Sequence, residues 1–166
     1  MPDKPKTYLI PEDAGIEMIQ MVLRQGMPHG MALGLEVVAV ARNTATLALP
    51  YREEFVGDPE SGVLHGGVVT TLIDSVCGMA LFASLEKLQA IATLDLRIDY
   101  LKPAAAQKRL LATAECYKMT RTIAFLRARA YHEEAPDDLI ASAAGAFMVG
   151  SSEARPFPPP DAEAKP

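Results

Sequence analysis

The spacing of hydrophobic residues in the first third of the chain predicts a helix followed by a β-hairpin. Residues 12–26 carry apolar side chains at i, i+3 and i+7, which is the spacing of one face of an amphipathic helix. Residues 34–41 and 44–50 are short apolar runs typical of strands. Arg42-Asn43 joins them, and because Asn tolerates turn conformations, we expect a hairpin there.

The middle and the last third of the chain predict a buried helix and a sheet. Residues 65–88 form the longest apolar segment, and a helix is favoured over a strand at this length. Four strand-like segments follow at 93–101, 109–117, 123–131 and 139–149. One face of the last three strands carries Ala, Cys and Gly, which lets another element lie close. The pattern predicts an α+β fold in which an antiparallel sheet wraps around one long central helix.

The two ends of the chain differ in composition from the part between them. Residues 12–150 are assigned to one domain of the 166-residue chain, since a domain typically takes about 100–200 residues. Residues 1–11 are polar and contain three prolines, so we expect a flexible arm. Residues 151–166 combine Ser, Glu and a run of Pro, a composition that predicts a disordered tail.

Charge and composition limit the partners and cofactors. The net charge of −5 argues against nucleic acid, which requires a basic face. The N-terminal segment lacks the pattern of a signal peptide, and the apolar stretches are too short for a membrane span, so we expect a cytoplasmic protein without a membrane partner. Cys77 and Cys116 form no CxxC pair, and no His/Cys cluster has zinc spacing. No metal and no other cofactor are therefore expected.

The start of the central helix combines features that suit an oxyanion or a polarised carbonyl. Gly66-Gly67 stands where a helix offers unpaired N–H groups and a partial positive charge, and glycine lets a ligand approach the backbone. Asp74 is the only charged side chain between Val68 and Leu85. A carboxylate on an apolar helix is costly unless it is paired or has a function, so Asp74 is a candidate general base. The alternative is a structural acceptor for neighbouring hydroxyls.

The separation of Gly66 and Asp74 bears on the oligomeric state. The two residues are eight positions apart, which corresponds to about 12 Å along a helix axis. They cannot both contact one carbonyl group from the same chain. If both act in one reaction, two helices lie antiparallel across a two-fold axis, and each supplies its Gly end to the Asp of the other. The sequence then predicts a dimer at least.

The segment HGGVVTTLIDSVCGMA followed by TLDLRIDYLKPA resembles the hotdog-fold acyl-CoA thioesterases, particularly the phenylacetyl-CoA thioesterase-like branch. The resemblance covers about residues 30–150 and implies a hotdog fold, acyl-CoA as substrate and a homodimer that often pairs into a homotetramer. It implies that Gly66 N–H polarises the thioester carbonyl while Asp74 of the opposing subunit activates water or attacks directly. Thr93 would orient the water or the Asp, and His65 would hold the loop and contact the carbonyl. Gly67 would belong to the substrate-binding residues.

The chain departs from this family at the second carbonyl donor. Many relatives have Asn six residues before the His, where this chain has Pro59, with Asp58 before it. An ionised carboxylate cannot donate a hydrogen bond. Lys102 and Arg121 are candidates to bind the CoA phosphates, as are Lys108, Arg109 and Lys118.

Two other functions stay open at this point. One is a hotdog hydratase or dehydratase, which the spacing from HGG to Asp fits less well. The other is a non-catalytic acyl-CoA-binding hotdog protein, which the missing Asn favours. A pocket lined by Met and Phe residues would suit an apolar or aromatic acyl group, but these residues are more often plain core.

Overall fold

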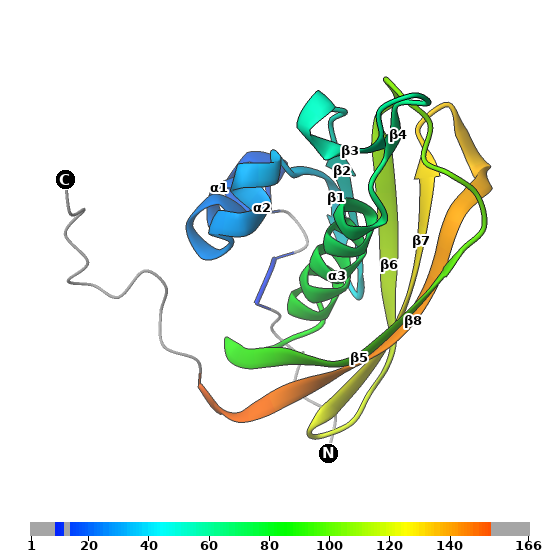
Figure 1. Ribbon diagram of the computed structural model, residues 1–166. Coiled ribbons are helices and arrows are strands. Elements are labelled where there is room, and N and C mark those ends of the chain that lie inside the picture. Colours follow the sequence, from blue (N-terminus) through cyan, green and yellow to red (C-terminus); the bar gives the residue numbers. More distant parts are fainter. Residues whose placement is uncertain (1–8, 12–13, 154–166) are drawn as a thin grey trace, which may run out of the picture.

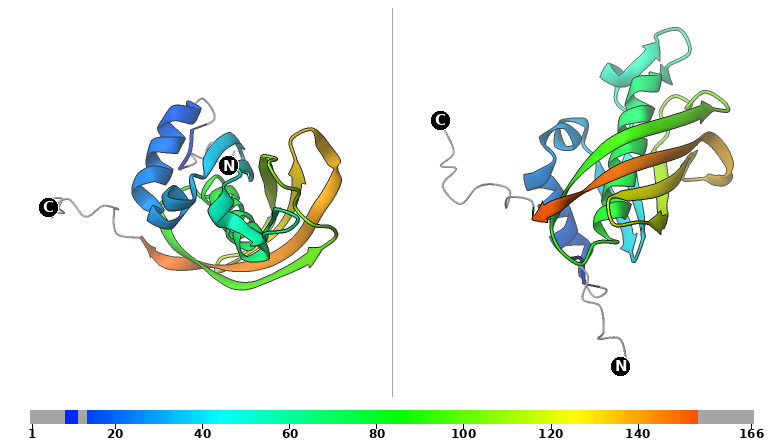
Figure 2. Two further views of the ribbon diagram at one scale, coloured as in Figure 1. Left: turned by 45° about the horizontal axis from the view of Figure 1, so that its top comes forward. Right: turned by 90° about the horizontal axis from the view of Figure 1, so that it is seen from below.

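The computed structural model describes residues 9–11 and 14–153, which form a curved antiparallel sheet around one long helix (Figure 1). The sheet has six strands in the order β1-β2-β6-β7-β8-β5. Their bounds are β1 Glu36–Ala41, β2 Thr44–Leu49, β5 Gln89–Tyr100, β6 Leu110–Met119, β7 Ile123–His132 and β8 Ala135–Glu153. The long helix α3, Gly66–Phe82, lies in the hollow of the sheet (Figure 2). The predicted α+β hotdog architecture is confirmed.

Small side chains on the sheet allow α3 to approach it closely. Ala112, Ala130 and Ala141 are fully buried on the concave face, as the sequence predicts. The helix packs on β2, β6 and β7 through Leu72, Ile73 and other fully buried apolar residues. Burial of an aliphatic side chain of this size stabilises the fold by about 1.5–3 kcal/mol. This packing fixes the position of α3 along the sheet, and therefore the positions of Gly66 and Asp74.

The first helical segment is shorter than predicted and is followed by a second helix. Helix α1 spans Ile16–Gly26 rather than 12–26, and residues 12–13 lie outside the described part. Helix α2 spans Pro28–Leu33 and ends at Gly34, whose φ of 73° favours glycine. Both helices lie beside α3, on the side that the curved sheet leaves uncovered (Figure 1).

Other boundaries also differ from the prediction. The segment 51–64 contains a 3-10 turn (Glu53–Phe55) and a small hairpin of β3 (Val56–Asp58) and β4 (Val63–Leu64), and is not only a loop. Helix α3 ends at Phe82 instead of continuing to 88. The chain turns there because Ser84 N donates to Leu81 O and its hydroxyl donates to Ala80 O.

The two predicted terminal segments are only partly described. Leu9 lies against the core and donates from its N–H to Leu85 O, so the predicted arm 1–11 is ordered at its end. Strand β8 continues through residue 153 because Glu153 pairs with Gln89, so the first three residues of the predicted tail belong to the sheet. Residues 1–8 and 154–166 lie outside the described part. No described helix has the length and apolar content to cross a bilayer.

Candidate active site at the N-terminus of the central helix

One backbone N–H group at the start of α3 differs from its neighbours in having no acceptor within the described part of the chain. His65 N donates to Phe55 O at 2.8 Å, and Val68 N donates to His65 O at 3.0 Å. Gly67 N donates to the His65 ring nitrogen Nδ1 at 3.0 Å. Gly66 N has no acceptor among the residues that the structure describes. Of the four N–H groups that a helix leaves unpaired at its N-terminus, the one at Gly66 is therefore available to a ligand.

His65 is the N-cap of α3, and its role explains the second glycine of the motif. A Cβ atom on Gly67 would lie only 2.9 Å from His65 Nδ1, so a side chain there would displace the ring. Because a backbone N–H can only donate, Nδ1 acts as the acceptor, which leaves Nε2 as the ring nitrogen that carries a hydrogen. The exposed His65 ring thus presents an N–H donor beside Gly66.

Asp74 lies two turns further along α3 and is held by Thr93. Thr93 Oγ1 donates to Asp74 Oδ1 at 2.8 Å. The carboxylate is half-buried in the single chain. It is therefore more accessible to solvent than the apolar sequence around it predicts. The threonines considered as its structural partners are engaged elsewhere, because the Thr70 and Thr71 hydroxyls donate to the carbonyl oxygens one turn earlier.

A β-bulge in β5 turns Thr93 toward the helix. Thr93 pairs with Phe147 and Asp95 pairs with the adjacent Ala146, so Leu94 is an extra residue in β5. Strict alternation would place Thr93 on the face opposite to Leu96, Ile98 and Tyr100, which is how the sequence pattern reads. The bulge reverses the face and leaves Leu94 exposed at 56%. The pairing of Thr93 with Asp74 depends on this irregularity.

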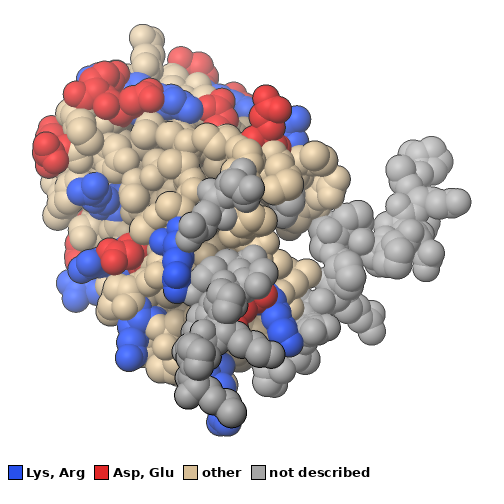
Figure 3. Space-filling view, turned by 180° about the vertical axis from the view of Figure 1, so that it is seen from behind, with Lys and Arg blue, Asp and Glu red and all other residues tan. Residues whose placement is uncertain are grey.

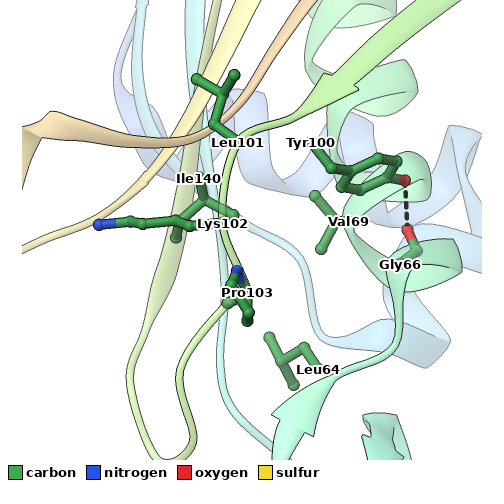
Figure 4. Close-up of a pocket in the computed structure, with 9 residues that line it drawn as sticks. Leu64, Gly66, Val69, Tyr100, Leu101, Lys102, Pro103 and Ile140 are labelled. Carbon is green, nitrogen blue, oxygen red and sulfur yellow. Dashed lines mark hydrogen bonds between the residues drawn. The ribbon is translucent and has the colours of Figure 1, made fainter.

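A pocket of about 380 Å³ opens beside Gly66 (Figure 4). Its walls are mainly apolar and come from the start of α3, the end of β5 and the segment after it. The lining residues are Leu64, Gly66, Val69, Tyr100, Leu101, Lys102, Pro103, Ala104 and Ile140. Tyr100 donates from its hydroxyl to Gly66 O at 2.9 Å, so its ring stands between the pocket and the first turn of the helix.

The basic residues proposed for the CoA phosphates do not gather in one chain. Lys102 lines the pocket and pairs with Asp138, and its ammonium points away from Gly66 (Figure 4). Arg121 is exposed in the turn between β6 and β7. Lys102 follows β5 at one end of the sheet, whereas Arg121 lies at the other end. Lys and Arg side chains are scattered over the face in Figure 3 and form no single patch on its described part.

Asp58 does not supply the missing second donor. Its carboxylate accepts hydrogen bonds from Glu60 N at 3.2 Å and from the Ser61 hydroxyl. These hydrogen bonds hold the pKa of Asp58 below its usual value, so the group is ionised near neutral pH. An ionised carboxylate only accepts, and it is already engaged in its own turn. Within one chain, His65 is the neighbouring residue whose side chain can provide a second donor beside Gly66 N–H.

Neither cysteine has the properties of a nucleophile. Cys77 and Cys116 are buried free thiols. Burial raises the pKa of Cys77 to about 12 and also raises that of Cys116. No group of three or more potential metal ligands is present in the described ranges. The candidate residues for chemistry at this site remain Gly66, His65, Asp74 and Thr93.

Comparisons with known proteins place the chain among thioesterases. The model of the Thioesterase superfamily matches residues 61–137. The medium/long-chain acyl-CoA thioesterase YigI of Escherichia coli K12 is 31% identical over 137 residues, which cover 75% of this chain and 86% of YigI.

Two solved structures have the same fold. A crystal structure of a Pseudomonas aeruginosa protein is 42% identical, with a TM-score of 0.70 over 80% of this chain and 97% of that one. A mutant of the phenylacetic acid degradation protein PaaI from Thermus thermophilus is 29% identical, with a TM-score of 0.64 over 73% and 97% of the two chains.

Proposed function

The chain belongs to the hotdog-fold thioesterases, and from this premise we propose that it hydrolyses acyl-CoA at a site shared by two copies of the chain. One observation carries the proposal. The available N–H of Gly66 and the carboxylate of Asp74, which Thr93 holds from β5, belong to the same helix, eight residues and about 12 Å apart. A single thioester group cannot reach both within one chain. An antiparallel partner helix brings the Gly66 of one chain to the Asp74 of the other.

The side of α3 that carries Asp74 suits such a partner. Gly67, Thr71, Asp74 and Gly78 follow one another at spacings of four, three and four residues, which places them along one side of the helix. None of the four is buried in the single chain. A Cβ on Gly78 would meet only Ile91, at 3.9 Å, so there is room for another backbone. The same pairing brings the end of the sheet that bears Lys102 toward the partner's Arg121 end, and both are then candidates for CoA phosphates.

The reaction follows from these positions. The thioester oxygen accepts the Gly66 N–H, with His65 Nε2–H as a second donor, at the positive end of the α3 dipole. Asp74 of the partner takes a proton from a water molecule, whose oxygen attacks the carbonyl carbon. The tetrahedral intermediate collapses, the C–S bond breaks, and the CoA thiolate leaves with the proton returned by Asp74. Attack by the Asp74 carboxylate itself, through an anhydride that water then cleaves, uses the same geometry.

The acyl group is proposed to be apolar. The pocket beside Gly66 has mainly apolar walls. The relatives named as medium/long-chain acyl-CoA thioesterases point to the same class of substrate. We therefore expect medium- or long-chain acyl-CoA to be hydrolysed faster than acetyl-CoA.

The test is replacement of Asp74 by Asn, which keeps the shape and an oxygen that accepts from Thr93. Release of free thiol from a panel of acyl-CoA esters should fall at least about a hundredfold, because general-base losses run about 10²–10⁴. Asp95→Asn, an exposed acid beyond the bulge of β5, is the matched control and should retain activity.

The alternatives give other results in the same assay. A hydratase would add water to crotonyl-CoA without releasing thiol, and a non-catalytic protein would bind acyl-CoA without turnover. Wild-type rates of thiol release in the Asp74→Asn protein would remove Asp74 from the mechanism.

A further inference from the structure

Three oxygen atoms meet at the first turn of α3. The Tyr100 hydroxyl lies 2.9 Å from Gly66 O and 2.7 Å from Thr70 Oγ1, and Thr70 Oγ1 lies 3.0 Å from Gly66 O (Figure 4 shows the first contact). The two hydroxyls have two hydrogens for these three contacts. Whenever both hydrogens point into the triangle, at least one of them is donated to Gly66 O. Either hydroxyl can therefore hold this carbonyl when the other is absent.

The neighbouring peptide groups are held as well. His65 O accepts from Val68 N at 3.0 Å, which fixes the peptide plane that contains Gly66 N–H. The next peptide plane is fixed through Gly66 O by the two hydroxyls, and through Gly67 N by the His65 ring. Glycine is the residue with the widest backbone freedom, so an unrestrained Gly66 would sample several directions of its N–H. Both planes around it are restrained here.

We propose that Tyr100 is a positioning residue for the thioesterase reaction. Its hydroxyl, together with that of Thr70, holds the peptide group that follows Gly66, and so limits the rotation at Gly66 that would turn its N–H away from the thioester oxygen before the substrate binds. This inference rests on the proposed role of Gly66 as the carbonyl donor. A donor stabilises a transition state most when its orientation requires no reorganisation during the reaction. Tyr100 acts through Gly66 and needs no contact with the reacting atoms.

Strand β5 then positions both candidate site residues of α3. Thr93 holds Asp74, and Tyr100 holds Gly66. The two strand residues are seven positions apart, and an odd separation in a regular strand puts side chains on opposite faces. The extra residue Leu94 brings both to the face of the helix. In the shared-site arrangement, the two residues of one β5 serve two different active sites.

The test removes the two hydroxyls singly and together. Tyr100→Phe keeps the ring and Thr70→Val keeps the shape, so each single variant leaves one hydroxyl donor to Gly66 O. Each should lower kcat by about threefold to tenfold, the equivalent of one hydrogen bond. The double variant should lower kcat by about a hundredfold, the scale of a lost oxyanion donor, with KM close to that of the wild type. Tyr100→Phe combined with Thr70→Ser should behave like Tyr100→Phe alone.

A spectroscopic measurement separates positioning from a structural role. A ketone analogue of acyl-CoA, with CH₂ in place of sulfur, is bound to each folded variant, and its infrared carbonyl frequency is measured. Binding to the wild-type protein should lower this frequency relative to that of the free analogue. In the double variant the frequency of the bound analogue should return most of the way to the value of the free analogue. Tyr117→Phe, a half-exposed tyrosine on β6, is the matched control and should change neither kcat nor the frequency.

The outcomes are distinguishable. A folded double variant with wild-type kcat and carbonyl frequency would overturn the role of Tyr100 and leave that of Gly66 intact. An unshifted frequency in the wild-type protein would overturn the role of Gly66, and the proposal with it. If the double variant does not fold, Tyr100→Phe alone must lower kcat and raise the frequency at unchanged KM. Wild-type values of both in that variant would also refute the proposal.

Discussion

Subunit complementation tests the shared site, and the structure suggests a clean way to remove the carbonyl donor. Gly66 is the first helical residue of α3, where proline is well tolerated, and His65 before it has the extended backbone that a following proline requires. A Cβ at this position would make only ordinary contacts with Tyr100, at 3.5 Å or more. Gly66→Pro therefore deletes one N–H at little cost to the fold. Gly66→Ala, which keeps the N–H, is the matched control and should lose less activity.

The expected recovery follows from counting sites. Homodimers of Gly66→Pro lack the donor at both sites and should retain about 1% of activity or less, since loss of an oxyanion donor costs about 10²–10³ in rate. Homodimers of Asp74→Asn should be as weak, because they lack the base. After random exchange of equal amounts, half of the dimers are mixed. Each mixed dimer has one site with both defects and one intact site, so about a quarter of the wild-type activity should return.

The assay is thiol release from a medium-chain acyl-CoA, measured before and after exchange of subunits. Exchange itself is followed by mass spectrometry, with the two variants carrying different tags, so that a slow mixture is not mistaken for an inactive one. A site built within one chain would carry a defect in every subunit, and mixing would restore nothing. If half of the dimers are mixed and both variants are folded, but thiol release stays at the level of the variant homodimers, the shared site is refuted.

Three further predictions follow from single contacts. Thr93→Val should lower kcat about tenfold or more, because the hydrogen bond to Asp74 is lost. Thr93→Ser keeps the hydroxyl and should retain most of the wild-type kcat, so equal activity of the two variants would contradict this prediction. The thiol of Cys77, with its pKa raised to about 12, should resist iodoacetamide at about pH 8 in the native protein and react only in denaturant. Peptide mass mapping measures this labelling, and rapid labelling of the native protein would refute the burial of Cys77. Gly34→Ala should reduce the free energy of unfolding by about 2 kcal/mol in urea titrations, because φ is 73° and the new Cβ would displace the Arg52 side chain. An unchanged midpoint of the titration would count against the left-handed conformation of Gly34.

Periodicity predicts the elements of the fold because most of them bury one regular face. The turn at Arg42-Asn43 is present, with Asn43 at φ 64°, and the small residues of β6 and β7 do lie against α3. The predicted end of α3, at residue 88, is wrong because the helix stops at Phe82. Leu85 is buried like a helical core residue, but it reaches the core from a turn. An apolar pattern records burial and does not distinguish these two backbones.

The site shows where local patterns stop being sufficient. Alternation along β5 assigns Thr93 to the solvent face, and only the resemblance to thioesterases singles it out. The bulge at Leu94 brings it to Asp74, and a bulge depends on pairing with β8, which is distant in sequence. Tyr100 belongs to a strand pattern in the sequence, and nothing there shows that its hydroxyl meets Gly66 O. Both contacts join segments that only the fold brings together.

The His-Gly-Gly motif illustrates how one short pattern contains several separate physical requirements. The second glycine is needed because the His65 ring occupies the space of its Cβ, at 2.9 Å. Gly57, on β3, is needed for a similar reason, since a Cβ there would lie 2.9 Å from His65 Cα. Gly66, in contrast, has room for a Cβ within the single chain. The fold of the single chain therefore sets no need for glycine at this position, and any intolerance of a side chain there would come from the substrate or from the partner helix of the proposed shared site.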